Sequence, residues 1–312
     1  MKKYCIGIDV GGTTVKCGLF TEKGELIENW EVVTCTDDNG SHILPDVAAS
    51  VEEKLRERNI AKEDVLGAGV GVPGPVDEAG ELPCAVNLHW GRKNIGKEMT
   101  ELLGIPSKAG NDANVAALGE MWKGGGEGAR SLVMITLGTG VGGGIIINGK
   151  IVTGAHGAAG EIGHANVEPY EEAVCNCGNH GCLEQMASAT GIVRLARIEL
   201  EKSPDASVLR DGELSAKSIF DAFKAGDSLA AKIVDRFAEY LGHAMAFMSA
   251  VVDPEVFVIG GGVSKAGEVL VESVKKYYQR DEFTACKDTP IVLAKLGNEA
   301  GIYGAAKLAL EA

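Results

Sequence analysis

Four side chains suited to binding a metal ion lie within nineteen residues of the sequence: His164, Cys175, Cys177 and Cys182. One imidazole and three thiolates complete the tetrahedral shell of a structural zinc site and leave no position for a catalytic water. The other cysteines are scattered singly in apolar stretches, as buried reduced thiols are, so we expect zinc rather than disulfide bonds. Such an ion would fix the loop that carries Glu161 and Glu184. His180 is the alternative nitrogen ligand, and unligated thiols are the alternative to a metal.

Two glycine-rich turns are each enclosed by apolar strands. Residues 4–20 (YCIGIDVGGTTVKCGLF) and 131–147 (SLVMITLGTGVGGGIII) share this plan, and a third glycine-rich strand end follows at 260–262. Backbone amides in such turns can hold phosphates, since glycine permits close approach. The turn residues expected to contact a nucleotide are Gly11, Gly12, Thr13, Thr14, Gly138, Thr139, Gly140, Gly142, Gly143, Gly260, Gly261 and Gly262. Plain structural turns are the alternative, and the repeated plan suggests an internal duplication.

The segment 138–143 also satisfies the dinucleotide pattern GxGxxG. That fingerprint must open a helix, whereas three isoleucines and then Asn148-Gly149, a hairpin turn signal, follow here. The context therefore excludes a dinucleotide site.

Three further polar residues stand at predicted strand ends. Asp9 ends the first strand, where its carboxylate could hold magnesium directly or through water; a solvated turn aspartate is the alternative. Asn111 and Asp112 lie where a strand gives way to a helix, so one of them is expected to cap that helix. A carboxylate at this position is also suited to accept a proton from an attacking hydroxyl group.

Helices and strands alternate around these residues. Val47, Val51 and Leu55 predict an amphipathic helix, residues 65–76 a strand, and residues 95–103 a helix. A strand before Asn111 leads into a helix, and the glycine-rich stretch 123–129 after it is the best candidate for a domain boundary.

The second half continues this alternation. We expect a long helical region at about 215–252, a strand at 256–262, a helix from Lys265, a strand at 290–297 and a closing helix at about 299–310. Such alternation predicts α/β layers.

Size and charge limit the possible functions. The 312 residues suffice for two α/β domains, and clefts between domains suit small molecules. The formal charge of -14 argues against nucleic acid or anionic lipid as a partner. No apolar stretch approaches the roughly 20 residues that cross a bilayer, and no cleavage-like site follows Met1, so we expect a soluble cytoplasmic protein.

The motifs resemble those of the ROK (repressor, ORF, kinase) sugar kinases of the actin-like ATPase superfamily, over essentially the whole chain. DVGGTTVKCGLF resembles the family's first phosphate motif, GVPGPVD its proline loop and GNDAN its catalytic segment. LGTGVGGGIIINGKIVTGAHGAAGEIGH resembles the family signature, and CNCGNHGCLE its zinc motif. One departure is Thr14, where many members have lysine.

This resemblance implies a duplicated actin-like (ribonuclease H-like) fold, with two α/β domains and an interdomain cleft. The smaller domain would comprise residues 1–118 with the C-terminal helix at about 299–312. The larger one, 119–298, would carry the zinc loop and a dimer surface, giving a homodimer or a dimer of dimers.

The resemblance also implies a hexose kinase that uses ATP and magnesium. Asp112 would take the proton from the 6-hydroxyl of the sugar, and one ring nitrogen of His164 would bind zinc while the other contacts the sugar. The residues that resemble the family's sugar contacts are Gly74, Asn87, Asn111, Asp112, Glu161, His164 and Glu184.

Glucose is the first choice of substrate, because the EIGH, NLHW and GGTT segments are similar to those of bacterial ROK glucokinases. N-acetylmannosamine, fructose and allose are the alternative sugars, and polyphosphate is an alternative donor. The family's repressors carry a helix-turn-helix domain before the first phosphate motif, which here begins within ten residues of Met1, so we expect no DNA binding. A non-catalytic sugar sensor is the remaining alternative.

Overall fold

The computed structural model describes residues 3–311. Two compact units make up the chain. The first comprises residues 1–130, 144–160 and 295–312, and the second comprises 131–143 and 161–294. The chain therefore passes between the units four times.

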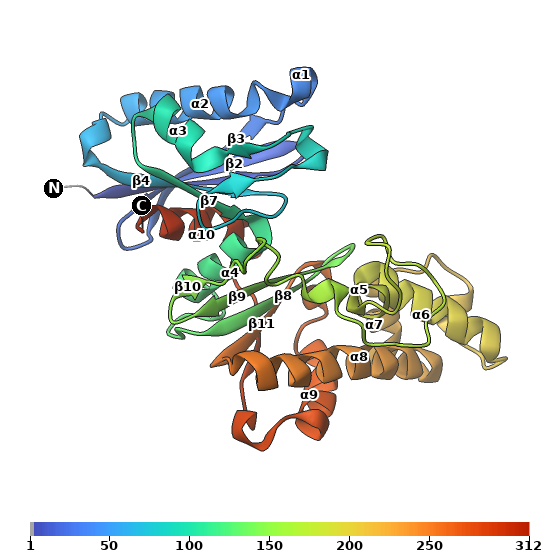
Figure 1. The fold of residues 1–312 in the computed structure, drawn as a ribbon. Coiled ribbons are helices and arrows are strands. Elements are labelled where there is room, and N and C mark those ends of the chain that lie inside the picture. The colour runs from blue at the N-terminus through green and yellow to red at the C-terminus, as the bar shows by residue number, and fades with distance from the viewer. Residues whose placement is uncertain (1–2, 312) are drawn as a thin grey trace. The chain divides into compact units, whose positions relative to one another are not determined.

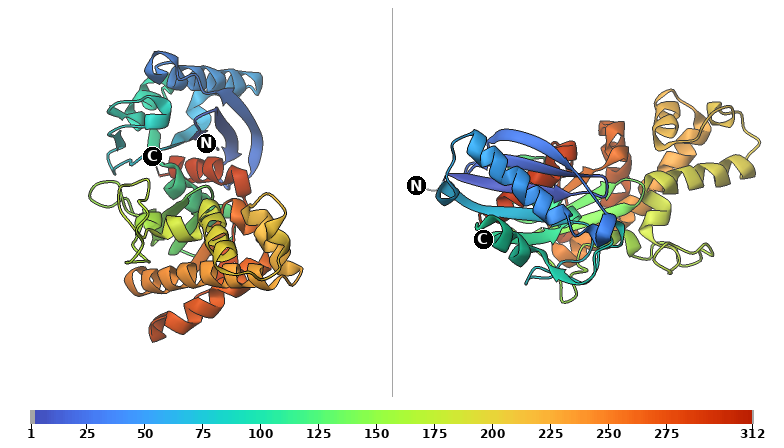
Figure 2. Two further views of the ribbon diagram at one scale, coloured as in Figure 1. Left: turned by 90° about the vertical axis from the view of Figure 1, so that its right-hand side faces the viewer. Right: turned by 90° about the horizontal axis from the view of Figure 1, so that it is seen from above.

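The first unit is built on a five-stranded sheet. Its strands are β1 (Tyr4–Val10), β2 (Thr14–Thr21), β3 (Leu26–Val33), β4 (Val65–Val72) and β7 (Ser107–Asn111), with a separate short pair β5 (Glu81–Leu82) and β6 (Lys93–Asn94). Its helices are α1 (Asp37–Gly40), α2 (Ile43–Glu57), α3 (Ile95–Leu103), α4 (Asp112–Lys123) and α10 (Ala300–Ala309). Helices α2 and α3 cover one face of the sheet, and α4 and α10 cover the other (Figure 1). Figure 2 shows blue α2 and red α10 on opposite sides of the blue strands.

Small residues let α10 lie close to its neighbours. A Cβ atom on Gly69 in β4 would collide with the carbonyl oxygen of Ala305, and one on Gly304 in α10 would collide with that of Val115 in α4. Glycine at these positions permits backbone contact between α10, the sheet and α4. The amphipathic helix expected around Val47 is confirmed, since Val47, Val51 and Leu55 on α2 are all buried against the sheet.

The second sheet consists of β8 (Leu132–Leu137), β9 (Val141–Ile147), β10 (Lys150–Ile151), β11 (Val256–Gly260) and β12 (Ile291–Leu293). Five helices belong to the second unit: α5 (Leu183–Ala187), α6 (Ala189–Lys202), α7 (Ala216–Lys224), α8 (Ser228–Val252) and α9 (Glu268–Asp281). The long helix α8 packs against all four of the others. In the right-hand view of Figure 2, the yellow and gold helices α6 and α7 form a layer beyond the end of the green strands.

Both sheets have the same topology. Numbered by their order in the chain, the strands of each sheet lie in the order 3-2-1-4-5, since the sheets read β3-β2-β1-β4-β7 and β10-β9-β8-β11-β12. In each sheet the first strand pairs in parallel with the fourth, β1 with β4 and β8 with β11. The predicted duplication and the actin-like α/β fold are therefore confirmed.

The prediction of one helical region from Ser215 to Val252 was too simple. It forms two helices, because the carboxylate of Asp227 accepts hydrogen bonds from the N–H groups of Leu229 and Ala230 and caps a new helix there. The strand expected at 256–262 ends at Gly260 and gives way to a 3-10 turn. The helix expected from Lys265 starts at Glu268.

The hairpin signal at Asn148-Gly149 is confirmed. Both residues have positive φ angles, 54° and 80°, and they join β9 to β10. Among the described residues, no helix combines the length and the apolar character needed to cross a membrane.

Candidate functional site

The first glycine-rich turn joins β1 to β2 and is fixed by β3. The N–H of Gly11 donates to the carbonyl oxygen of Thr14 at 3.1 Å, which closes the turn. Thr34, just after β3, donates its hydroxyl to the carbonyl oxygen of Gly11 at 2.7 Å, and its N–H to that of Thr13 at 3.0 Å. Gly12 and Thr13 are exposed at the tip. The turn thus presents backbone to solvent in a fixed shape, and its anchor Thr34 was not foreseen from the sequence.

Asp9 lies largely buried at the start of this turn. It stands opposite Lys16 across the β1–β2 pair, and its carboxylate lies against Gly301 in the first turn of α10. Burial raises the pKa of Asp9 from 3.8 to about 6; the nearby Asp112 carboxylate raises it further and Lys16 opposes the shift. A cation bound at this carboxylate would favour its charged form and lower the pKa of Asp9 again.

Asn111 organises the junction between β7 and α4. Its side-chain oxygen accepts hydrogen bonds from the N–H groups of Ala113 and Asn114 at 3.0 and 3.1 Å, so Asn111 is the cap that the sequence left undecided. Its side-chain NH₂ donates to the carbonyl oxygen of Gly74 at 3.1 Å and to Oδ1 of Asp112 at 3.0 Å. Asn111 therefore joins the loop at Gly74 to the carboxylate of Asp112.

Asp112 is exposed in the first turn of α4. Its Oδ1 also accepts the N–H of Ala113 at 2.9 Å. Two donors on one carboxylate oxygen fix the plane of the group, and a negative charge at a helix N-terminus is favourable. Asn87 is exposed on the 3-10 turn Val86–Leu88, and it lies three residues after Cys84, whose carbonyl oxygen packs against the backbone of Gly74.

The second glycine-rich turn, between β8 and β9, is fixed by α5 and α6. Oε2 of Glu184 in α5 accepts the N–H of Val141 at 3.0 Å. At the start of α6, Ala189 donates its N–H to the carbonyl oxygen of Gly138 at 2.8 Å, and Thr190 donates its hydroxyl to that of Thr139 at 2.8 Å. Glu184, identified as a sugar contact by resemblance, is therefore also part of the support of this turn.

The third glycine-rich segment lies beside the second turn. Gly260 at the end of β11 pairs with Thr136 in β8, and the backbone of Gly261 packs against that of Leu137, one residue before the turn begins. The hydroxyl of Ser264 donates to the carbonyl oxygen of Gly261 at 2.7 Å. The expected nucleotide-binding segments of the second unit thus lie side by side.

The four expected zinc ligands form one cluster. Their ligand atoms all lie within 4.8 Å of one another. The sulfur atoms of Cys177 and Cys182 are 3.7 Å apart, and Nδ1 of His164 lies 3.9 Å from the sulfur of Cys175. Tetrahedral zinc with Zn–S of about 2.3 Å and Zn–N of about 2.0 Å requires about 3.8 Å between two sulfur atoms and about 3.5 Å between sulfur and nitrogen. The cluster therefore fits a structural zinc ion.

His180 is not in this cluster. Its Nδ1 lies 3.0 Å from the carbonyl oxygen of Glu172. His164 is thus the histidine of the cluster, and it lies three residues after Glu161, which is exposed and whose carbonyl oxygen accepts the N–H of His164 at 3.1 Å. Zinc bound at His164 would therefore also fix the backbone at Glu161.

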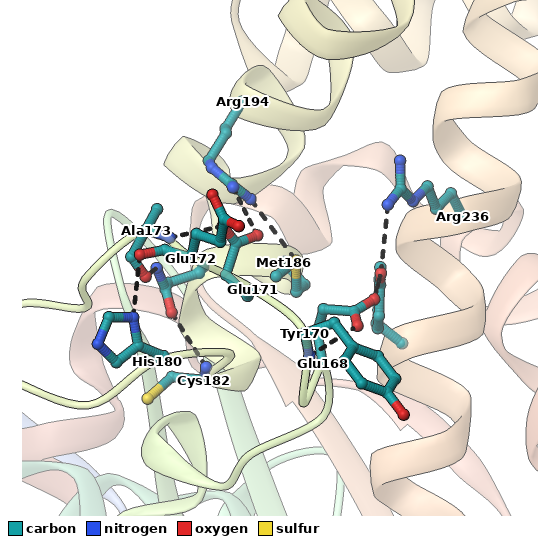
Figure 3. Close-up of polar contacts among 12 residues, drawn as sticks. Glu168, Tyr170, Glu171, Glu172, Ala173, His180, Cys182, Met186, Arg194 and Arg236 are labelled. Carbon is teal, nitrogen blue, oxygen red and sulfur yellow. Dashed lines mark hydrogen bonds and ion pairs between the residues drawn. The ribbon is translucent and has the colours of Figure 1, made fainter.

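The loop between His164 and Cys182, which carries the cysteine cluster, is anchored to three helices (Figure 3). Gln185 in α5 accepts the N–H of Cys182 at 3.1 Å and donates to the carbonyl oxygen of Ala173 at 2.9 Å. Arg194 in α6 forms an ion pair with Glu171 at 2.5 Å, and Tyr240 in α8 donates to Glu168 at 2.7 Å.

The titration of Glu171 reflects this anchoring. Burial raises the pKa of Glu171, but the N–H of Ala173 and the guanidinium of Arg194 outweigh it and hold the pKa below its ordinary value. The carboxylate is therefore charged where it meets Arg194, and the loop has fixed attachments besides the metal.

Comparison with known proteins gives consistent matches over the whole chain. A family model described as the ROK family matches residues 5–312. A glucokinase from Halalkalibacterium halodurans is 42% identical over 308 residues, 97% of this chain and 93% of the relative. A glucokinase from Thermotoga maritima is 36% identical over 319 residues, 99% of this chain and 98% of the relative.

A solved structure matches equally far. The ROK family glucokinase from Streptomyces griseus, in complex with glucose and AMPPNP, is 33% identical with a TM-score of 0.75. The match covers 99% of this chain and 100% of that one.

Metal analysis tests the ligand assignment. Because Cys177 supplies one of four ligands and His180 none, Cys177→Ser should lose the zinc while His180→Ala keeps about one zinc per chain. Mass spectrometry of the purified proteins measures the metal, and the melting temperature should fall only in the cysteine variant. Loss of zinc from His180→Ala with retention in His164→Ala would overturn the assignment.

The pH dependence of stability tests the burial of Asp9. Since its pKa is raised from 3.8 to about 6, the folded chain holds this proton more tightly than the unfolded chain does. The resulting stabilisation is present at low pH and is lost as the pH rises through about 6. The Asp9→Asn side chain does not titrate, so the variant should gain about 2–3 kcal/mol relative to wild type between about pH 4 and pH 7. Urea unfolding without nucleotide or metal measures this, and a constant difference would contradict it.

Proposed function

The chain belongs to the ROK family, and from this premise we propose that it is an ATP-dependent glucokinase, which transfers the γ-phosphate of ATP to the 6-hydroxyl of glucose. The observation that carries the proposal is the arrangement around Asn111. One amide side chain holds the loop at Gly74 and the carboxylate of Asp112 in a single geometry. An exposed, oriented carboxylate is what a sugar hydroxyl needs in order to lose its proton as it attacks.

Asp112 is the proposed general base. It accepts the proton of the 6-hydroxyl, and the oxygen then attacks the γ-phosphorus in line as the bond to the β-phosphate oxygen breaks. Asn111 does not take the proton; it fixes the carboxylate plane through its hydrogen bond to Oδ1. The proton transfer contributes about 10²–10⁴-fold to the rate.

The glycine-rich segments are the proposed ATP site. Backbone at 11–14 and 138–143 binds the phosphates, and 260–262 lies on the adenosine side. Magnesium, when bound with ATP, would neutralise charge on the phosphates, and Asp9 is the residue proposed to hold it. Thr14 brings no cation to the first turn, where many relatives have lysine, so phosphate binding there rests on backbone amides and hydroxyl groups.

The proposed sugar contacts come from both units. Gly74, Asn87, Asn111 and Asp112 belong to the first unit, and Glu161, His164 and Glu184 to the second. The zinc ion would have a structural role: Nδ1 of His164 would hold it, which would leave the other ring nitrogen to donate to a ring hydroxyl. Glu184 accepts the N–H of Val141 and so supports the proposed phosphate-binding turn. The same side chain is a proposed sugar contact.

We extend the proposal to a cytoplasmic homodimer. Helix α8 exposes two large apolar side chains one turn apart on the same face, Phe247 and Val251, which are 66% and 69% exposed. Adjacent exposed apolar groups of this size are typical of protein contacts. Light scattering of the purified protein should give twice the chain mass of 32.5 kDa or a multiple of it, and a monomer at all concentrations would contradict this proposal.

A coupled assay across sugars and donors tests the substrate. With ATP, glucose should give the highest kcat/KM, ahead of N-acetylmannosamine, fructose and allose. Relatives named glucokinase support this order. Polyphosphate in place of ATP should support little turnover. A preference for another sugar by about ten-fold or more would reject glucose while keeping the kinase.

Replacement of the base tests the mechanism. Asp112→Asn keeps the size of the side chain but cannot take a proton, so kcat should fall by about 10²–10⁴-fold while calorimetry still detects glucose binding. Asp46→Asn is the matched control, since Asp46 is also exposed in the first turn of a helix, α2. Turnover of Asp112→Asn within about ten-fold of wild type would remove Asp112 from this role.

A further inference from the structure

Glu120 is a wholly buried carboxylate that the mechanism does not use. It lies in α4 with an exposed fraction of 0%. Its Oε2 accepts the N–H groups of Gly125 and Lys295 at 2.6 and 3.0 Å, and its Oε1 accepts the N–H of Leu296 at 2.8 Å. A carboxylate without water is tolerated only when such donors surround it, and hydrogen bonds to a charged acceptor are the strong ones.

The three donors lie at the ends of two connections between the units. Gly125 belongs to the glycine-rich stretch that leads to Arg130, where the chain leaves the first unit for the second. Lys295 and Leu296 are the first residues after its final return. Glu120 thus fixes the start of the first and the end of the last of the four connections between the units.

Both fixed segments lead to the proposed active site. Glu120 lies two turns after Asp112 on the same helix. From Leu296 the chain continues through the 3-10 turn Gly297–Glu299 into α10, whose Gly301 lies against the carboxylate of Asp9. The return segment is therefore tied to the helix of the base just before it reaches the other site carboxylate.

We propose that Glu120 is a positioning residue, a clamp that holds two of the connections between the units on α4 and so keeps Asp112 on α4, and α10 beside Asp9, in the arrangement that binds the substrates. This inference rests on the proposed function, because the bound substrates are those of the kinase. Each of the three donors is a backbone N–H group, and all three donate to the one carboxylate of Glu120.

If the hydrogen bonds of Glu120 are weakened, we expect the KM values of the substrates to change and kcat to stay nearly constant. When only a fraction of molecules has the binding arrangement, the apparent affinity for each substrate falls by that fraction. Saturating substrates restore the arrangement, so kcat is retained. A role in folding alone gives the opposite pattern, since fewer active molecules lower kcat and leave KM unchanged.

Glu120→Gln tests the clamp. The amide presents an NH₂ group to one of the three N–H donors, so at least one hydrogen bond is lost while size is kept. We expect the KM values for glucose and ATP to rise together, by about three- to ten-fold, with kcat within about two-fold of wild type. Hydrogen exchange of peptides with residues 124–126 and 295–296 should become about ten-fold faster.

Glu127→Gln is the matched control, because Glu127 is in the same loop but its side chain is 61% exposed. It should leave both kinetics and exchange as in wild type. The proposal is overturned if Glu120→Gln leaves the exchange of both peptides unchanged, or if kcat falls while both KM values stay constant.

Hydrogen exchange of the wild-type protein tests the clamp even if the variant does not fold or the protein has no kinase activity. If Glu120→Gln does not fold, protection of 124–126 and 295–296 should exceed that of the exposed segment 211–213 by about ten-fold or more, and equal protection overturns the clamp. A wild type without sugar kinase activity rejects the proposed function, whereas the exchange measurements still decide whether Glu120 holds the two connections.

Discussion

The side-chain amide of Asn111 is the interaction on which the first half of the site depends. Its oxygen ends β7 and begins α4 by capping two N–H groups, and its NH₂ joins the backbone of Gly74 to the carboxylate of Asp112. Among the contacts of residues 3–311, only the amide of Asn111 both accepts hydrogen bonds from the start of α4 and donates to the loop at Gly74. The strand order of the sheet places the junction at the carboxyl end of β7, where α/β folds present ligand-binding residues.

Glu184 supports the second glycine-rich turn in the second unit. Its carboxylate accepts the N–H of Val141 in the second glycine-rich turn, and it lies two residues after Cys182, a member of the proposed zinc cluster. The zinc cluster and the anchors at Arg194 and Tyr240 fix the loop before this residue. The proposed zinc ion would thus act on the site through the backbone and not through an open coordination position.

Much of this arrangement followed from local sequence. The apolar runs around each glycine-rich turn predicted both hairpins, and Asn148-Gly149 predicted the turn that joins β9 to β10. Contacts between residues far apart in the sequence could not be predicted. Thr34 and Gly11 are 23 positions apart, Val141 and Glu184 are 43 apart, and Lys295 and Glu120 are 175 apart. The preference for His164 over His180 came from the sequence motif, and the fold agrees with it by turning His180 toward Glu172. The boundaries of the domains and the roles of the site residues stay predictions.

A crystal structure with glucose and a non-hydrolysable ATP analogue tests the central claim most directly. The account predicts a carboxylate oxygen of Asp112 within about 3 Å of the 6-hydroxyl, on the side opposite the leaving oxygen of the nucleotide. Glucose bound with its 6-hydroxyl turned away from Asp112, next to a different acid or base, would contradict it.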